Sequence, residues 1–433
     1  MSKFICLFFA LLSVFESNAT VVLQKGRSFP SQVKTSNTYY EIRDEFNLGG
    51  VNVKIPNGCT LVFRGGSVKN GTLDLNGCRI EGVGIKCKIK NPTNYAYPLS
   101  RYLADTKDPE MNNTVVQTLI DASVPVIIDY PQLEFKQHLS VNTNVTVQSA
   151  SECRVQLSFP NSRGFVWDKV VYSQHNNFKA LHVESKGHGF DLVNSGDKNR
   201  PRNVFFNTFS NLRVVSNEGD CFTAGQDNNG AMGGTCVFDN YFELIEVVAP
   251  NGYGFVGISG NTHHFTKVRC VGCGKAFFHN CSGVFDSCNG TWGSTPTFYK
   301  GTRKNKNNAE RYPCIFRNCN VESYTGVLFD CRDALCYMEL TLEDCSFYIT
   351  PNKNKVVDYY PFDFDVLFQL RMRNNFFYIY DNGKYDSNHS LFRVGYMSNM
   401  EKVDVDRELN IVDRLLQHYT ITQTKMEIKK LSR

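Results

Sequence analysis

A repeated motif constrains the fold of this 433-residue chain more than any other feature. Each copy has a Phe, two variable residues, an apolar residue or Cys, one variable residue and then usually Val or Cys. Apolar residues alternate with others inside each copy, which is the period of a β-strand, and helical periodicity is absent. Copies begin at Phe178, Phe209, Phe242, Phe265, Phe285 and Phe316, with degenerate copies at Leu342 and Met372.

A second element follows each copy at a nearly constant distance, whereas the distance between copies varies. It reads G-H-G-F, G-D-C-F, G-Y-G-F and G-K-A-F, and a rigid rung with loops of variable length produces such a pattern. We therefore predict an all-β parallel β-helix, a solenoid whose rungs pair about 4.8 Å apart. The second element is predicted to end at Phe190, Phe222, Phe255 and Phe277, with Phe298 and Leu328 in later copies.

The first 19 residues have the layout of a secretory signal peptide. Lys3 precedes an apolar run from Phe4 to Phe15, and small or polar residues end at Ala19. The run is too short to span a bilayer, and no later stretch approaches 18 apolar residues. We expect a secreted, periplasmic or cell-surface protein whose mature form has no membrane span.

Cysteine usage raises the question of a metal site. Of the 16 Cys, one lies in the predicted signal, so 16 − 1 = 15 remain, and at least one stays reduced or pairs between chains. Cys270 and Cys273 are spaced C-x-x-C, but a zinc site needs a second converging ligand pair and none follows. We predict no metal there, because Cys270 aligns with inward Val residues of other copies. Inward thiols are also predicted on three successive rungs, at Cys288, Cys319 and Cys345.

The chain is expected to divide into four parts. Residues 1–19 form the signal, residues 20–95 an N-terminal β module of short strands, residues 96–400 the β-helix, and residues 401–433 a C-terminal cap. Within the third part, residues 114–123 have helix-like apolar spacing, with Asn113 as the predicted N-cap of a short capping helix.

A short helix, an apolar strand and then Phe- and Asn-rich rungs resemble the pectate-lyase-like superfamily of right-handed parallel β-helix proteins. The segment CTLVFRGGSVKNGTLDLNG resembles an N-terminal β module of secreted Bacteroides-type members. The resemblance covers most of residues 40–400. It implies a right-handed β-helix and a polysaccharide partner lying along the stacked strands, but not one activity, since this fold hosts lyases, hydrolases, tailspikes and adhesins.

Two rows of outward side chains are candidate binding residues. Glu246 between Arg213 and Arg269 indicates a polyanion-binding strip, with Glu246 as acid, base or ion ligand; the alternative is a solvated salt-bridge ladder. The second row offers an imidazole, a carboxylate, a ring and a cation to a sugar, or is surface decoration. The first row comprises His182, Arg213, Glu246, Arg269, Asn289, Asn320 and Ser346, and the second comprises His188, Asp220, Tyr253 and Lys275.

If the chain is an enzyme, we expect a polysaccharide lyase acting on a uronate-containing glycan rather than a hydrolase. The G-H-G of residues 187–189 matches a polygalacturonase tripeptide, but the accompanying D-D and R-I-K are missing, so we interpret it as a rung turn. A lyase needs a cation for the uronate carboxylate and a base for the α-proton. The candidate catalytic residues are Glu246, Arg269 and Lys267, with Lys275 and His264 as further bases and Ca²⁺ as the cofactor to test.

The alternative is a non-catalytic glycan-binding, adhesin or tailspike-like β-helix, and the oligomeric state is open. A formal net charge of +5 is small for this length. No basic cluster occurs beyond Arg303–Lys306, so we expect no nucleic-acid partner.

Overall fold

The computed structural model divides the chain into two compact units, residues 1–129 and 130–433. The predicted signal peptide up to residue 18, the Arg303–Lys306 cluster and most of the predicted C-terminal cap lie outside the described residues. The structure describes residues 19–168, 172–193, 203–224, 236–258, 262–290, 297–302, 311–324, 327–332, 337–349, 361–367, 369–379, 392–397, 404–405, 421–423 and 426–428.

The first unit is built from short parallel strands in two sheets, ordered β1-β2-β5-β7 and β3-β6-β4, with β8 paired to β6. Apolar residues alternate with polar ones, so one face of each strand is buried; Tyr40, Leu61 and Ile80 stack in register across β2, β5 and β7. The elements are β1 (Thr20–Val22), α2 (Phe29–Gln32), β2 (Tyr39–Ile42), β3 (Glu45–Asn47), β4 (Asn52–Lys54), β5 (Thr60–Phe63), β6 (Ser67–Asp74), β7 (Arg79–Glu81), β8 (Ile85–Lys90), η1 (Leu99–Arg101), α3 (Pro109–Asp121) and β9 (Val126–Ile128).

The helix predicted near residue 114 is present, but its predicted start is wrong. Helix α3 begins at Pro109, and the Asp108 side chain accepts a hydrogen bond from the backbone N–H of Glu110 at 2.9 Å. Asp followed by Pro is a strong helix start, because the carboxylate satisfies an open N–H and Pro has none to satisfy. The predicted cap Asn113 lies buried inside the helix, which packs on β8.

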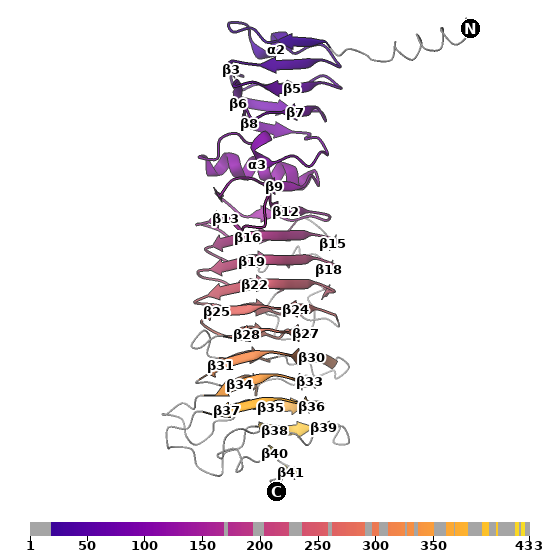
Figure 1. Cartoon of the computed structure of the whole chain (residues 1–433), viewed down its shortest axis with the longest axis vertical. Helices are drawn as coiled ribbons and strands as arrows, with labels where there is room; N and C mark the ends of the chain where they lie inside the picture. The colour runs from indigo at the N-terminus through magenta and orange to yellow at the C-terminus, as the bar shows by residue number, and fades with distance from the viewer. Residues whose placement is uncertain are drawn as a thin grey trace, which may run out of the picture. The chain divides into compact units, whose positions relative to one another are not determined.

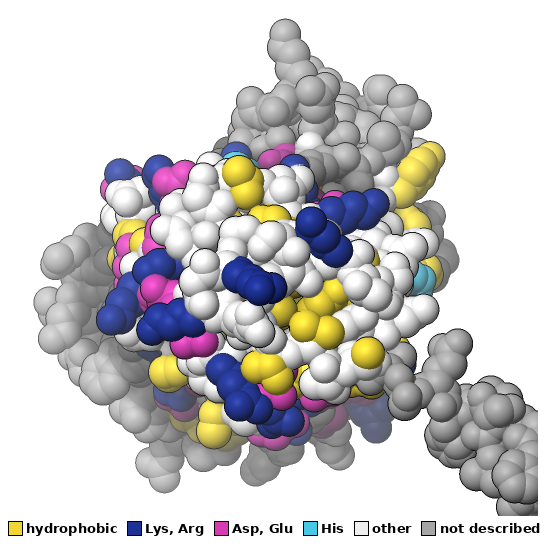
Figure 2. Space-filling view, turned by 90° about the horizontal axis from the view of Figure 1, so that it is seen from above, with side chains coloured by type: hydrophobic (Ala, Val, Ile, Leu, Met, Phe, Trp, Pro, Cys, Tyr) yellow, Lys and Arg dark blue, Asp and Glu magenta, His cyan; other side chains and the backbone are white. Residues whose placement is uncertain are grey.

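The N-terminal end of the first unit carries a mixed surface. Figure 2 shows its Lys and Arg side chains interspersed with acidic, apolar and neutral ones rather than joined into one basic patch. No helix among the described residues is long and apolar enough to cross a membrane.

The second unit confirms the predicted parallel β-helix. Each rung has one long strand or a pair of strands, followed by a short strand of a second sheet, and successive rungs stack (Figure 1). The long strands are β16 (Asn177–Ser185), β19 (Thr208–Ser216) and β22 (Tyr241–Ala249). The paired strands are β24 (His264–Thr266) and β25 (Arg269–Cys273), β27 (Gly283–Asp286) and β28 (Asn289–Gly290), β30 (Arg311–Arg317) and β31 (Asn320–Tyr324), β33 (Tyr337–Glu343) and β34 (Ser346–Ile349), and β36 (Gln369–Arg373) and β37 (Phe376–Ile379).

The remaining strands of the second unit complete these sheets. The second sheet runs through β11 (Leu139–Ser140), β14 (Phe165–Val166), β17 (Phe190–Asp191), β20 (Phe222–Thr223), β23 (Phe255–Val256), β26 (Phe278–His279), β29 (Tyr299–Lys300), β32 (Phe329–Cys331), β35 (Phe362–Leu367), β38 (Phe392–Met397), β40 (Ile421–Gln423) and β41 (Met426–Ile428). The others are β10 (Gln132–Glu134), β12 (Thr146–Ser149), β13 (Val155–Phe159), β39 (Asp404–Val405) and a small third sheet of β15 (Tyr172–Gln174), β18 (Asn203–Phe205) and β21 (Cys236–Phe238).

The repeated Phe positions form one buried ladder, as predicted. Phe178 and Phe209 stack with ring centroids 5.4 Å apart, and rings of the second sheet such as Phe190 meet them edge to face. Burying each such side chain contributes about 1.5–3 kcal/mol, and edge-to-face contacts add to this. The register is continuous through Phe178, Phe209, Phe242, Phe265, Phe285, Phe316, Leu342 and Met372.

Each rung bends at the second residue after the inward Phe. That residue has a left-handed backbone in every copy, with φ between 50° and 55°, although none of the eight is Gly. Left-handed backbone is unusual for Leu and Lys, which indicates that pairing on both sides dictates the bend. The bends fall at Ala180, Asn211, Leu244, Lys267, Ser287, Asn318, Asp344 and Asn374.

The predicted second-sheet register is wrong by one residue from the fourth copy onward. Phe255 pairs with Phe278 rather than Phe277, and Tyr299 and Phe329 follow in place of Phe298 and Leu328. Phe278 follows the inward Phe265 by 13 residues, as in the two preceding copies, rather than by the predicted 12, although Val271 bulges out of β25 between them. The three displaced residues are nevertheless buried.

Buried Asn side chains tie successive rungs together at the position two before the inward Phe. Asn207 Oδ1 accepts hydrogen bonds from the backbone N and the side-chain Nδ2 of Asn176, at 3.1 and 2.8 Å. Asn240 Oδ1 accepts the same pair from Asn207. His263 ends the row by accepting the Asn240 N–H at Nδ1, so polar groups inside the wall are satisfied from rung to rung.

Candidate functional site

The C-x-x-C pair is part of the wall. Cys270 pairs with Val247 and Cys273 with Ala249, both inward positions, and Val271 between them is 38% exposed. The Sγ atoms are 3.2 Å apart, and burial raises the pKa of the Cys273 thiol. No group of three or more His, Cys, Asp or Glu in the described part of the chain has the geometry to hold a metal ion.

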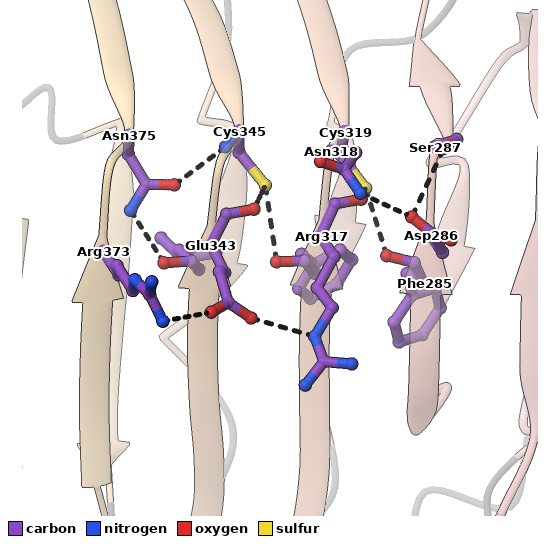
Figure 3. A network of polar contacts seen from close by, with 12 residues as sticks. Phe285, Asp286, Ser287, Arg317, Asn318, Cys319, Glu343, Cys345, Arg373 and Asn375 are labelled. Atoms are coloured by element: carbon purple, nitrogen blue, oxygen red, sulfur yellow. Dashed lines mark hydrogen bonds and ion pairs between the residues drawn. The ribbon is translucent and has the colours of Figure 1, made fainter.

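The predicted thiol ladder is also present. Cys319 and Cys345 each donate to a carbonyl oxygen of an adjacent rung, Phe285 and Phe316 respectively (Figure 3). Cys288 continues the row. None of the cysteines that the structure describes is in a disulfide.

The first outward row is in the predicted register. His182, Arg213, Glu246, Arg269, Asn289, Asn320 and Ser346 are consecutive Cα partners on neighbouring rungs. Parallel pairing without an offset therefore brings side chains from seven distant sequence positions into one line on the outer face.

Glu246 lies between two guanidiniums, but not the predicted pair. Arg213 Nη1 is 2.8 Å from Oε2, and Arg154 Nη1 is 3.4 Å from Oε1. Arg154 also donates to Asn211, which holds it across the intervening rungs. Partial burial alone would raise the pKa of Glu246, but the Arg213 hydrogen bond and both positive charges outweigh it, so the pKa is lowered. Arg269 was the predicted second partner and makes no ion pair with Glu246.

Two positively charged side chains on the rung of Arg269 have no acidic partner among the described residues. Lys267 and Arg269 are exposed, and no carboxylate of the described residues lies within 4.0 Å of either. Lys267 sits at the bend, two residues before Arg269. On the other side of the bend, the rings of Tyr241 and His264 stack with centroids 5.1 Å apart.

Three atoms of the same row have unmet hydrogen-bonding capacity. His182 Nε2, Asn289 Oδ1 and Asn320 Oδ1 are buried and have no hydrogen-bond partner among the described residues. Burial, followed by the charge of Arg213, lowers the pKa of His182, which keeps the imidazole neutral. Unsatisfied polar atoms are rare in folded proteins and often mark a place where water or a ligand binds.

The second outward row is joined through backbone N–H groups. His188 Nδ1 accepts from the Asp220 N–H at 3.0 Å, and Asp220 Oδ1 accepts from the Tyr253 N–H at 2.9 Å. With Nδ1 accepting, neutral His188 carries its proton on Nε2 and presents a donor. Asp220 is almost fully buried and 3.5 Å from His188 Nδ1. Burial and the Asp220 charge raise the pKa of Tyr253, so its hydroxyl stays protonated.

Lys275 is not in the predicted position of this row. Because of the register shift, Ala276 is equivalent to Tyr253, as shown by the bonds Gly254 N–H to Ala276 O and Cys221 N–H to Tyr253 O. Lys275 still reaches the row, with Nζ 5.2 Å from the centre of the Tyr253 ring. The Tyr253 ring also stacks on His279, with ring centroids 4.5 Å apart.

The G-H-G tripeptide and its equivalents have a packing role. A Cβ on Gly189 would lie 2.4 Å from Val214 Cγ1, and one on Gly252 would lie 2.0 Å from the Gly219 carbonyl oxygen. Glycine is therefore required for close stacking of rungs at these turns. This supports the interpretation of residues 187–189 as a rung turn.

A third polar cluster was not predicted. Asp330 and Asp363 are register partners on the second sheet, and Arg332 Nε lies 2.8 Å from Asp330 Oδ1 and 3.7 Å from Asp363 Oδ2. Burial would raise the pKa of Asp330, but Arg332 outweighs it and the pKa is lowered. The recurrence of Phe-Asp in FDC and FDF was the available signal.

No family model matches the sequence, and no curated protein is similar to it at a significant level. Among solved structures, a similar chain is the catalytic domain of a GH87 alpha-1,3-glucanase in complex with tetrasaccharides. The TM-score is 0.31 and the identity 12%, over 86% of this chain and 67% of that one.

Proposed function

We propose that this chain is an exported β-helix protein of the pectate-lyase-like kind that binds a uronate-containing polysaccharide along the outer face of its second unit. The observation that carries the proposal is the exposed pair Lys267 and Arg269, which has no acidic neighbour within the described residues. Elsewhere on these rungs, arginines are neutralised, as where Glu343 lies between Arg317 and Arg373 (Figure 3).

The pair suits a carboxylate on a sugar. Guanidinium groups bind carboxylates with two parallel hydrogen bonds, and a neighbouring ammonium adds charge without a fixed geometry. Tyr241 and His264 begin the neighbouring strands β22 and β24. Their stacked rings offer an apolar surface to the face of a sugar. A chain of uronates would therefore find charge and ring contacts on adjacent rungs.

Glu246 fits a positioning role better than a chemical one. Both of its oxygens are engaged by guanidiniums, and its lowered pKa keeps it ionised. A carboxylate held in this way is a weak base. In this proposal it fixes Arg213 and Arg154, and Arg213 then lines the strip next to His182.

A lyase reaction at the second row is the alternative function, favoured by the contact of Tyr253 with Lys275 and His279. In β-elimination a base removes the proton α to the uronate carboxylate, the bond to the β-oxygen breaks, and an acid protonates that oxygen. Tyr253, protonated because of its raised pKa, suits the acid. Lys275, with Nζ 5.2 Å from the Tyr253 ring centre, would neutralise the uronate carboxylate.

Binding is tested by electrophoresis of the full chain through gels that contain polygalacturonate, alginate or chondroitin sulfate. Lys267→Ala with Arg269→Ala should weaken retardation about tenfold, the loss expected when a pair of charge-assisted contacts disappears. Arg373→Ala removes an exposed positive charge that is already paired with Glu343 and serves as the matched control. Equal retardation of the double variant and the control would refute the proposed strip.

The lyase alternative has its own readout. Incubation of the same polysaccharides with and without Ca²⁺ should release unsaturated products with ultraviolet absorbance, and Tyr253→Phe should abolish the release while leaving retardation intact. Export predicts that N-terminal sequencing of the mature protein begins at Thr20; an intact Met1 would contradict it.

A further inference from the structure

The first unit carries a surface cluster of two arginines and two tyrosines, the Arg–Tyr patch, in which Arg79 and Tyr95 are exposed and Tyr97 and Arg101 are half-buried. The Tyr95 and Tyr97 ring centroids are 5.6 Å apart at an interplanar angle of 29°. Arg101 lies 4.6 Å over the Tyr97 ring and Arg79 5.5 Å from the Tyr95 centre. Tyr95 is 47% exposed. The four side chains form a row of cation, ring, ring and cation.

Buried groups hold this row in place. The hydroxyl oxygen of buried Tyr102 is 3.3 Å from the carbonyl oxygens of Thr93 and Tyr95, and the Tyr97 N–H donates to Tyr95 O at 2.9 Å. Arg101 Nη1 donates to Ile80 O at 2.9 Å. The loop that carries the tyrosines is thus fixed to the strand wall, which lowers the entropy lost when a ligand binds.

No acidic side chain of the described residues pairs with the arginines of the patch. No carboxylate of the described residues is within 4.0 Å of the guanidinium of Arg79 or Arg101. Arg79 instead donates from Nη2 to the Tyr95 hydroxyl at 3.2 Å. Ion pairing is the ordinary fate of a surface arginine beside acids, so two unpaired guanidiniums on a rigid aromatic surface leave binding capacity for an anion.

We infer that the Arg–Tyr patch is a second binding site for an acidic saccharide, separate from the strip on the second unit. A uronate carboxylate would bind a guanidinium, and the apolar face of the sugar would lie against the exposed Tyr95 ring. A single-stranded nucleic acid also uses arginines and rings, but its successive bases stack on open ring faces. The two rings here already stack on each other, which favours a saccharide. The ligand class rests on the proposed function.

The test is retardation of the full chain in gels containing polygalacturonate, alginate or chondroitin sulfate, with neutral dextran as reference. The variants Arg79→Ala, Tyr95→Ala and their combination should lower affinity for at least one acidic polymer, about fivefold or more for the double variant. Arg64→Ala, an exposed arginine of the same unit, and Tyr172→Ala, a tyrosine 56% exposed, should change nothing.

Tyr95→Phe removes only the hydroxyl group and keeps the aromatic ring, so this variant should retain most of the affinity. Unchanged retardation of the Arg79 and Tyr95 double variant on all three acidic polymers would overturn the inference. So would an affinity for a single-stranded oligonucleotide that exceeds the affinity for every acidic polysaccharide and depends on Tyr95. The proposed binding strip on the second unit is tested separately, by the retardation of the Lys267 and Arg269 double variant.

Discussion

Cys270 and Cys273 lie with their Sγ atoms 3.2 Å apart inside the second unit because Val271 bulges out of the strand between them. Two inward residues of a strand are normally two positions apart; the bulge makes the separation three. A spacing typical of zinc ligands thus arises from strand geometry.

Thiol reactivity should follow burial. The thiolate is the reactive form, and burial raises the pKa of Cys221, Cys273 and Cys331, whereas Cys153 is exposed. We expect brief alkylation of the native protein to label Cys153 well before these three, as measured by mass spectrometry of the peptides. Equally fast labelling of Cys273 would show that the wall opens readily.

The stability contributed by Glu246 should depend on pH. Its folded-state pKa is below the ordinary value of 4.5, so its contribution is complete above that value and is lost as pH falls through the lower folded pKa. Glu246→Gln should destabilise the protein by about 0.5–1 kcal/mol at pH 7. The difference should shrink as unfolding is measured at decreasing pH below the ordinary value. Glu243→Gln changes an exposed glutamate of the same strand that forms no ion pair with the described residues, and it should alter stability little at pH 7.

The buried Asn row should be sensitive to a single truncation. Asn207→Ala removes the acceptor for two Asn176 groups and a donor to Asn240, and unsatisfied buried groups cost about 1–3 kcal/mol each. We expect a clearly lower midpoint of urea unfolding. Asn251→Ala removes an exposed side chain that bonds one carbonyl and should change the midpoint little. Similar midpoints for the two variants would contradict the structural role of the row.

Two glycines of neighbouring rungs should respond differently to the same substitution. A Cβ at Gly252 would meet the Gly219 oxygen at 2.0 Å and Asp220 Oδ1 at 2.9 Å, whereas a Cβ at Gly272 would meet no atom within 4 Å. Gly252→Ala should therefore lower the melting temperature and disturb the Asp220–Tyr253 contact, while Gly272→Ala should be neutral. A neutral Gly252→Ala would mean that the rungs can separate at little cost.

The sequence predicted the first strand of each rung better than the second. Inward Phe residues mark the first strand in each copy, so the row from His182 to Ser346 could be aligned without a structure. The second strand follows a bulge in the fourth copy, and adjacent Phe277 and Phe278 fit the pattern equally well. Only the pairing distinguishes them.

The ion-pair partners of Glu246 could not be predicted from the sequence, because long side chains reach past the neighbouring rung. Register places Arg269 next to Glu246, yet Arg154, from a rung further away, occupies the carboxylate. Long flexible side chains select partners by three-dimensional geometry that sequence spacing does not encode. The Asn row was in principle visible, because Asn precedes the inward Phe by two residues at Asn176, Asn207 and Asn240.

The bulge at Val271 has a consequence for how this fold changes length. Phe278 comes five positions after Cys273, whereas Phe255 comes six positions after its partner Ala249, so the residue gained in the strand is lost again at the corner. An insertion and a deletion within one rung thus cancel before the next strand begins. Each rung can therefore gain and lose a residue without displacing the next rung. Alignments of distant homologues should show an insertion and a deletion a few residues apart.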